Sequence, residues 1–205
     1  MHSYLALGDS YTIGEGVPLY DSYPYQAVQL LRKAGKNFYA PEIIARTGWT
    51  TDELAVAIAG TRLLPRYDLV TLLIGVNNQY RGRDLEEYGV QFEQLLHQAI
   101  GLAQPAIGSA QPRGRVLVLS IPDWGVSPFA ETQEKDREGI ATAINSFNTL
   151  ARQITQEQGL PFIDITDHSR TQGTPANFVA DGLHPGAGQY AWWAEQLAGA
   201  AGTTQ

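Results

Sequence analysis

The sequence predicts an α/β protein: a five-stranded parallel sheet covered by helices on both faces. Five apolar segments alternate along the chain with helical patterns, which favours this fold class. The clearest segment, Tyr67–Ile74, is apolar almost throughout, as expected for a strand buried between two helical layers. The 205 residues contain no internal repeat, low-complexity block or linker, so a single domain over residues 1–205 is expected. The flavodoxin-like strand order 2-1-3-4-5 suits this pattern.

Short apolar runs bounded by turn residues identify the strands. The first is a run that ends at Gly8-Asp9, so Ser10 is expected in a loop at the carboxyl end of a strand. Pro41 weakens the second and indicates an edge position, because proline lacks the N–H that a central strand needs. In chain order the predicted strands are Tyr4–Leu7, Phe38–Ala45, Tyr67–Ile74, Arg115–Pro122 and Pro161–Thr166.

Helical periodicity and capping residues identify the helices between these strands. Pro24 is a favourable first helical residue and Gly35 a stop signal for the first helix. Thr50 and Glu53 have the spacing of a capping box, which begins the second. In chain order the predicted helices are Pro24–Ala34, Thr50–Leu64, Asp84–Ile107, Glu131–Gln158 and Gln189–Ala200.

Composition narrows the possible partners. The net charge of -7 and the pI near 5.0 disfavour nucleic acid and anionic membranes, since an acidic surface repels phosphate groups. The chain has no cysteine, so it has no disulfide, thiolate metal site or cysteine nucleophile. No apolar run is long enough to span a bilayer, and no signal-peptide pattern is present. A cytoplasmic location is therefore expected if residue 1 is the natural start.

Several chemically useful residues follow strands of the predicted sheet. Ser10, Gly48, Asn77 and the Asp181–His184 segment would all meet at the carboxyl edge, where open α/β sheets bind ligands. A serine becomes a nucleophile when an imidazole takes its proton and a carboxylate orients that imidazole. The spacing of Asp181 and His184 suits such a pair, and it equally suits a loop cap. Each of the other three positions also has a purely structural interpretation as a cap or turn residue.

Taken together, four motifs resemble the SGNH hydrolases, the GDSL-type esterases and lipases. They are Gly8-Asp9-Ser10-Tyr11, a loop Gly48, Gly75-x-Asn77 and Asp181-x-x-His184-Pro185. The resemblance implies that Ser10 is the nucleophile of a triad with His184 and Asp181. It also implies an oxyanion hole from the N–H groups of Ser10 and Gly48 and the amide of Asn77. The reaction implied is hydrolysis of a small-molecule carboxylic ester through an acyl-enzyme, with no metal or organic cofactor.

One residue departs from the family pattern. The third motif usually reads Gly-x-Asn-Asp, whereas Asn78 stands here in place of the aspartate. Because a neutral amide can still hydrogen-bond, we expect altered support of the site rather than lost catalysis.

Two rival interpretations remain open. One is a metal-dependent hydrolase that uses the acidic and histidine residues Asp164, Asp167, His168, Asp181 and His184. This scatter lacks the helical H-E-x-x-H spacing of a zinc protease. The other is a non-catalytic binding module on the same fold.

Loop aromatics indicate where substrate could bind. Trp49, Tyr80 and Trp124 are expected to border the site, and Phe129 and Phe178 lie in loops near the same edge. Short-chain esters or acetylated sugars are favoured because no exposed apolar lid is evident. A lysophospholipase or thioesterase of the same family is the alternative.

Overall fold

A computed structural model describes residues 1–104 and 114–202. Within them, parallel strands form one five-stranded sheet of order β2-β1-β3-β4-β5, which confirms the predicted topology. The strands are β1 (Tyr4–Gly8), β2 (Glu42–Ala45), β3 (Leu69–Leu73), β4 (Arg115–Leu119) and β5 (Phe162–Ile163). All residues of β1 and β3 are buried, which explains their unbroken apolar sequences.

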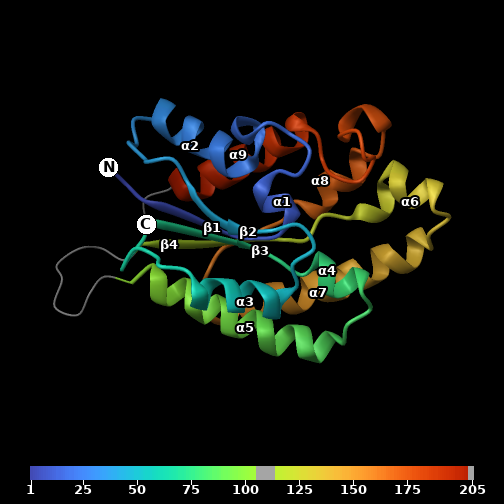
Figure 1. Ribbon diagram of the computed structural model, residues 1–205, viewed down its shortest axis with the longest axis horizontal. Coiled ribbons are helices and arrows are strands. Elements are labelled where there is room, and N and C mark those ends of the chain that lie inside the picture. The colour runs from blue at the N-terminus through green and yellow to red at the C-terminus, as the bar shows by residue number, and fades with distance from the viewer. Residues whose placement is uncertain (105–113, 203–205) are drawn as a thin grey trace.

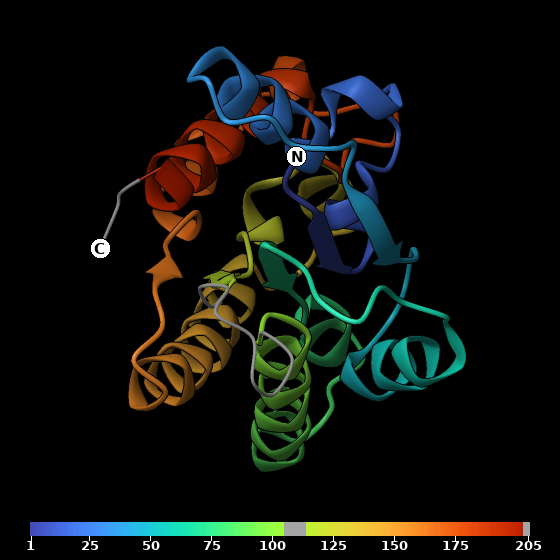
Figure 2. The ribbon, with the colours of Figure 1, turned by 90° about the vertical axis from the view of Figure 1, so that its left-hand side faces the viewer.

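Two layers of helices enclose the sheet (Figures 1 and 2). On one face lie α2 (Tyr23–Lys33) and α9 (Ala187–Gly202), packed against each other. On the other lie α3 (Thr51–Gly60), α5 (Leu85–Leu102) and α7 (Arg137–Glu157). Shorter helices gather near the carboxyl ends of the strands: α1 (Ser10–Ile13), α4 (Val76–Tyr80), α6 (Pro128–Thr132) and α8 (Thr166–Thr171). Single 3₁₀ turns cover Leu19–Asp21, Trp124–Val126 and Pro175–Asn177.

The second strand is shorter than the sequence predicts. Phe38 forms only an isolated bridge with His2, and regular pairing begins at Glu42, immediately after Pro41. Proline has no N–H to donate to the ladder, so the strand resumes beyond it. The edge position that Pro41 predicts is confirmed, because β2 pairs with β1 alone.

The predicted helix Glu131–Gln158 is wrong in one respect: it is two helices. The first, α6, ends at Thr132, and Glu134 adopts a left-handed conformation with φ 49°. The side chain of Asp136 then accepts a hydrogen bond from Gly139 N–H and begins α7. A capping aspartate inside a helical pattern therefore starts a new helix instead of continuing the old one.

The ends of two other predicted helices also differ. The helix expected over Thr50–Leu64 ends at Gly60, because Thr61 is extended. The helix expected over Asp84–Ile107 ends at Leu102, and residues 105–107 of that prediction lie outside the described residues. Across residues 1–104 and 114–202, no helix is both long and apolar enough to cross a bilayer.

A buried carboxyl group lies where β1 joins α1. Asp9 is inaccessible to solvent, and its Oδ1 accepts a hydrogen bond from Tyr11 N–H at 3.0 Å, which caps α1. Its Oδ2 has no hydrogen-bond partner within the described part of the chain. Burial raises the pKa of Asp9 to about 7, because a desolvated carboxylate is poorly stabilised.

Asp9 should therefore make the stability of the protein depend on pH. Its native pKa lies above the unfolded value of about 3.9, so the native state holds a proton that the unfolded state releases. The free energy of unfolding should then fall as the pH rises from about 4 through about 7, with a slope of up to about 1.4 kcal/mol per pH unit. Asp9→Asn keeps the cap and removes this titration, so its stability relative to wild type should increase over the same interval.

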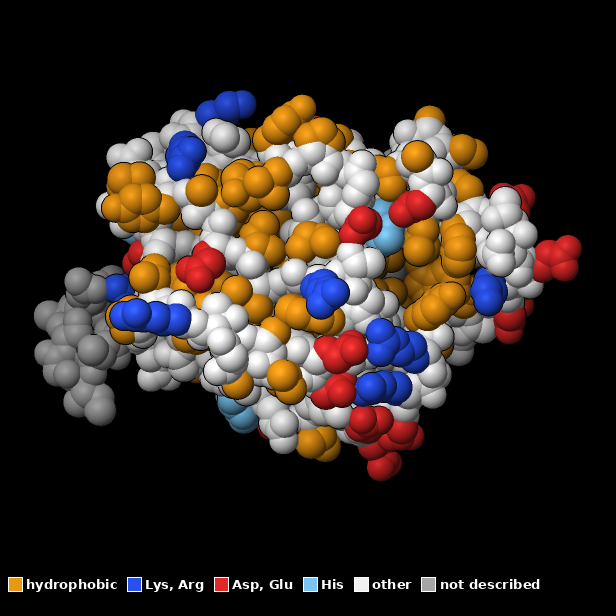
Figure 3. Space-filling view, in the orientation of Figure 1, with side chains coloured by type: hydrophobic (Ala, Val, Ile, Leu, Met, Phe, Trp, Pro, Cys, Tyr) orange, Lys and Arg blue, Asp and Glu red, His pale blue; other side chains and the backbone are white. Residues whose placement is uncertain are grey.

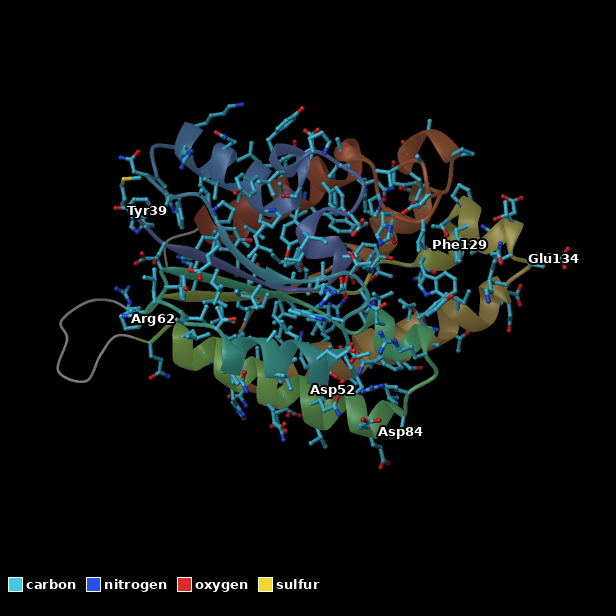
Figure 4. The ribbon with its side chains drawn as sticks, viewed as in Figure 1. Tyr39, Asp52, Arg62, Asp84, Phe129 and Glu134 are labelled. Carbon is cyan, nitrogen blue, oxygen red and sulfur yellow. The ribbon has the colours of Figure 1, made fainter. Side chains whose placement is uncertain are left out.

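Urea denaturation of both proteins between about pH 4 and 8 measures the effect. Asp84→Asn is the matched control, because Asp84 is an exposed aspartate that caps α5 (Figure 4). Stability curves that stay parallel for wild type and Asp9→Asn would contradict the prediction.

Candidate active site

Ser10 is presented by a short helix rather than by the loop that the sequence predicts. The capping side chain of Asp9 begins α1, and Gly14 ends it in a left-handed conformation. The Ser10 side chain is nearly buried, at 5% exposure of the residue, and its hydroxyl makes no hydrogen bond to any described residue. An aspartate cap followed five residues later by glycine is the signal that could have identified this helix. Its N-terminal position leaves the Ser10 N–H outside the helical ladder.

Asp181 and His184 form a hydrogen-bonded pair within one turn. The Nδ1 of His184 lies 2.6 Å from Oδ2 of Asp181, and Oδ1 accepts the N–H groups of Leu183 and His184 at 2.8 and 2.9 Å. Burial acts to raise the pKa of Asp181, but the hydrogen bonds from His184 and Leu183 outweigh it and lower that pKa. An ionised Asp181 accepts a hydrogen bond from the Nδ1–H of His184, which leaves the Nε2 of His184 unprotonated and able to act as a base.

The β2–α3 turn and α4 are joined by hydrogen bonds. Gly48 lies in this turn with φ 85°, a conformation that favours glycine. The Asn77 side-chain amide donates to the carbonyl of Trp49 at 3.0 Å, and Arg81 donates to the carbonyl of Gly48 at 2.6 Å. One amide hydrogen of Asn77 is therefore committed to the turn. The second remains to be directed at a bound group.

Asn78 adds hydrogen bonds between α4 and the start of α3. Its side chain is buried, with Oδ1 accepting from Thr51 N–H at 3.1 Å and Nδ2 donating to Thr51 Oγ1 at 2.7 Å. Thr51 is the first residue of α3. The residue that departs from the family pattern thus fastens α4 to α3.

A pocket of about 200 Å³ lies at this edge of the sheet. It brings together Ser10, Gly48, Asn77 and His184, four of the five residues predicted to carry the chemistry. Asp181 lies behind His184 and contacts its ring. The remaining lining residues are Tyr11, Thr47, Val76, Tyr80, Trp124 and Leu183. Figure 3 shows the molecular surface hollowed near its right-hand end, with hydrophobic side chains on the floor and a histidine at the border.

The predicted aromatic residues take different places. Tyr80 and Trp124 line the pocket, whereas Trp49 packs half-buried against the core and offers only its carbonyl to the site. Phe129 contacts Trp124 with ring centroids 6.5 Å apart and lies near the same end of the molecule (Figure 4). Phe178 lines a neighbouring cavity of about 10 Å³, which Trp124 also lines. Sequence reasoning missed Tyr11, Thr47, Val76 and Leu183, which follow directly from their neighbours' positions on the same turns.

Apart from the Asp181–His184 pair, the residues of the metal-hydrolase interpretation have other partners. Asp164 bonds Arg152, Asp167 bonds Arg170, and the ring of His168 stacks on Trp192 at 3.9 Å. In the described ranges, no group of three or more histidine, cysteine, aspartate or glutamate residues is placed to hold a metal ion.

Comparisons with known proteins agree with the geometry. The sequence pattern of the GDSL-like lipase/acylhydrolase family matches residues 6–192. A curated protein of Streptomyces rimosus, named lipase, is 28% identical in an alignment that covers 84% of this chain and 74% of that protein.

Solved structures share the fold at low sequence identity. An acetylxylan esterase from Geobacillus stearothermophilus is 17% identical with a TM-score of 0.73, and the match covers 99% of this chain and 95% of that one. A lipase/acylhydrolase from Enterococcus faecalis is 20% identical with a TM-score of 0.73, covering 97% and 94%. Because the family pattern extends from β1 into α9, the chain belongs to the GDSL-like lipase/acylhydrolase family and is a carboxylic ester hydrolase.

Proposed function

We propose that this hydrolase is a serine esterase with Ser10 as nucleophile, His184 as general base and Asp181 as the carboxylate that orients His184. The observation that carries the proposal is the shared pocket of Ser10 and His184, with Asp181 hydrogen-bonded to the far nitrogen of the same imidazole. Gly48 and Asn77 line that pocket as well. With the N–H of Ser10, they would provide an oxyanion hole for the ester carbonyl oxygen.

In the first half-reaction, the Ser10 hydroxyl attacks the ester carbonyl carbon and His184 takes the hydroxyl proton on Nε2. Asp181 accepts a hydrogen bond from the Nδ1–H of His184 throughout and stabilises the imidazolium that forms. The negative charge on the carbonyl oxygen is stabilised by the N–H groups of Ser10 and Gly48 and by the amide of Asn77. The tetrahedral intermediate then collapses, and His184 returns the proton to the departing alcohol.

In the second half-reaction, His184 removes a proton from water, which attacks the acyl group on Ser10. The same donors stabilise the second oxyanion, and the proton returns from His184 to Ser10 as the acid leaves. All of the required proton transfers use groups of this chain, so the reaction needs no metal or organic cofactor.

The size of the pocket supports short acyl groups, such as acetyl, as substrates. Its volume of about 200 Å³ is below the roughly 300–1,000 Å³ of pockets that enclose drug-sized ligands. The acetylxylan esterase from Geobacillus stearothermophilus acts on an acetylated sugar, which is consistent with this choice. A lysophospholipase or thioesterase is the alternative within the family, and an assay across acyl length and leaving group separates the three.

The nucleophile is tested by Ser10→Ala. The variant lacks the attacking oxygen, so ester hydrolysis and covalent labelling by a fluorophosphonate should both fall to background. Folding should persist, because the Ser10 hydroxyl makes no hydrogen bond to a described residue. A thermal melt checks the fold. Hydrolysis at the wild-type rate in this variant would exclude the proposed mechanism.

The oxyanion hole is tested by Asn77→Ala. Loss of one donor aimed at developing charge typically lowers kcat by about 10²–10³, while KM changes less. Asn77→Asp should be worse, because it places an acceptor and a negative charge where a donor is needed.

Asn78→Ala is the matched control for this pair. This substitution removes the hydrogen bonds between α4 and Thr51, and Asn78 does not line the pocket. It should therefore lower thermal stability more than kcat. An unchanged kcat in well-folded Asn77→Ala would leave the oxyanion hole to the two backbone N–H groups.

A further inference from the structure

We propose that Trp124 is a specificity-determining residue that separates the catalytic pocket from a neighbouring open groove and so limits the length of an aliphatic chain in the substrate. The inference rests on the proposed function, because the chain in question is part of the ester that Ser10 would attack. The esterase mechanism itself leaves the length of that chain open, and the position of the Trp124 indole would limit it.

Trp124 lines three cavities, and two of them are large enough to hold part of a substrate. The catalytic pocket has a volume of about 200 Å³, and a neighbouring groove has a volume of about 450 Å³. The two share Tyr80 and Trp124 among their lining residues. The rest of the groove is lined by Gln79, Lys135, Asp136, Gly139 and Ile140. The hydrophobic floor of the hollow in Figure 3 continues toward a lysine or arginine on its right-hand side.

The Trp124 indole contacts two neighbouring residues of α4. The indole N–H of Trp124 donates to Oε1 of Gln79 at 2.8 Å, which bridges from the loop after β4 to α4. Its ring meets Tyr80 edge-on, with centroids 5.3 Å apart. Trp124 is 5% exposed whereas Tyr80 is 50% exposed, so the indole is the buried member of the pair.

The backbone that carries Trp124 is also fixed. Asp123 is buried, and its carboxylate pairs with Nε of Arg170 at 2.9 Å and accepts Gly125 N–H at 2.9 Å. The Asp123 N–H donates to Ser169 Oγ. Two residues earlier, Asn148 bonds both the N–H and the carbonyl of Ile121. The backbone on both sides of Trp124 is therefore held by hydrogen bonds. Displacing the indole would break its hydrogen bond to Gln79 and leave the buried indole N–H unpaired.

An indole in this position would select substrates by the length of their aliphatic chain. A short chain fits on the catalytic side, while a longer one must displace the indole or leave the pocket for solvent. Removing the indole would connect the pocket to the groove, where Tyr80 and Ile140 offer apolar surface. Each additional buried methylene is worth about a fourfold gain in affinity, so the benefit should grow with chain length.

Trp124→Ala tests the inference with two series of substrates. In the first, p-nitrophenyl esters run from acetate to octanoate; in the second, alkyl acetates run from ethyl to octyl. The kcat/KM ratio of the longest to the shortest substrate should rise at least tenfold over wild type in one series. That series identifies whether the acyl or the alcohol chain points at Trp124.

Two further variants sharpen the test. Gln79→Ala removes the acceptor of the indole N–H and should raise the same ratio by a smaller factor, which keeps the test available if Trp124→Ala does not fold. Trp192→Ala is the matched control: this tryptophan stacks on His168 and lines neither cavity, so the ratio should not change.

The outcomes distinguish this inference from the proposed function. If wild type and both variants hydrolyse acetate esters and label with fluorophosphonate, but the ratio stays the same in both series, the role of Trp124 is refuted and the esterase mechanism stands. If folded wild type neither labels nor hydrolyses any ester, the proposed function fails and the role of Trp124 fails with it.

Discussion

The placement of the site depends on one point of register in the sheet. Gly8 pairs with Ala45 on one side and with Leu73 on the other, so β1, β2 and β3 end at the same level. A side chain at Gly8 could not be accommodated, since its Cβ would lie 2.4 Å from the Leu73 carbonyl oxygen. Close approach of these strands is what allows three separate chain segments to deliver Ser10, Gly48 and Asn77 to one pocket.

Hydrogen bonds between the connections then fix the geometry that the strands make possible. Asn77 donates to the carbonyl of Trp49 and Arg81 donates to the carbonyl of Gly48, so two hydrogen bonds connect that turn to α4 and the residue that follows it. The turn with His184 comes from much later in the chain and is held by the Asp181 carboxylate and by a backbone hydrogen bond from Val179 N–H to the His184 carbonyl at 2.9 Å. Tyr11, next to Ser10, packs edge-on against the His184 ring with centroids 5.8 Å apart, which links the two halves of the pocket.

The sequence was informative where a single physical effect dominates. Continuous apolar runs identified the buried strands, because burial on both faces demands them, and Pro41 identified the edge. It was misleading where two local effects compete. Asp136 reads as one polar residue in a helical pattern, yet its capping bond ends one helix and begins another. The short helices at Ser10 and Asn77 are too brief for periodicity to reveal. Among the aromatics, a loop position near the edge of the sheet suggested Trp49, but sequence spacing does not specify side-chain direction, and the Trp49 side chain packs against the core.

The asparagine at position 78 illustrates how a departure from the family pattern can be internally consistent. Thr51 presents a backbone N–H, which needs an acceptor, and a hydroxyl that already donates to Gln91 and so needs a donor. The amide of Gln91 in turn donates to a carboxylate oxygen of Glu87. The direction of this chain is thus fixed at both ends, and the side chain at 78 must accept at one atom and donate at the other. An amide does both, whereas an ionised carboxylate would meet the Thr51 oxygen with no hydrogen between them unless Thr51 and Gln91 both reoriented. The neutral residue at 78 therefore matches Gln91 and Glu87, and it secures the helix of Asn77 without placing a negative charge beneath the proposed oxyanion hole.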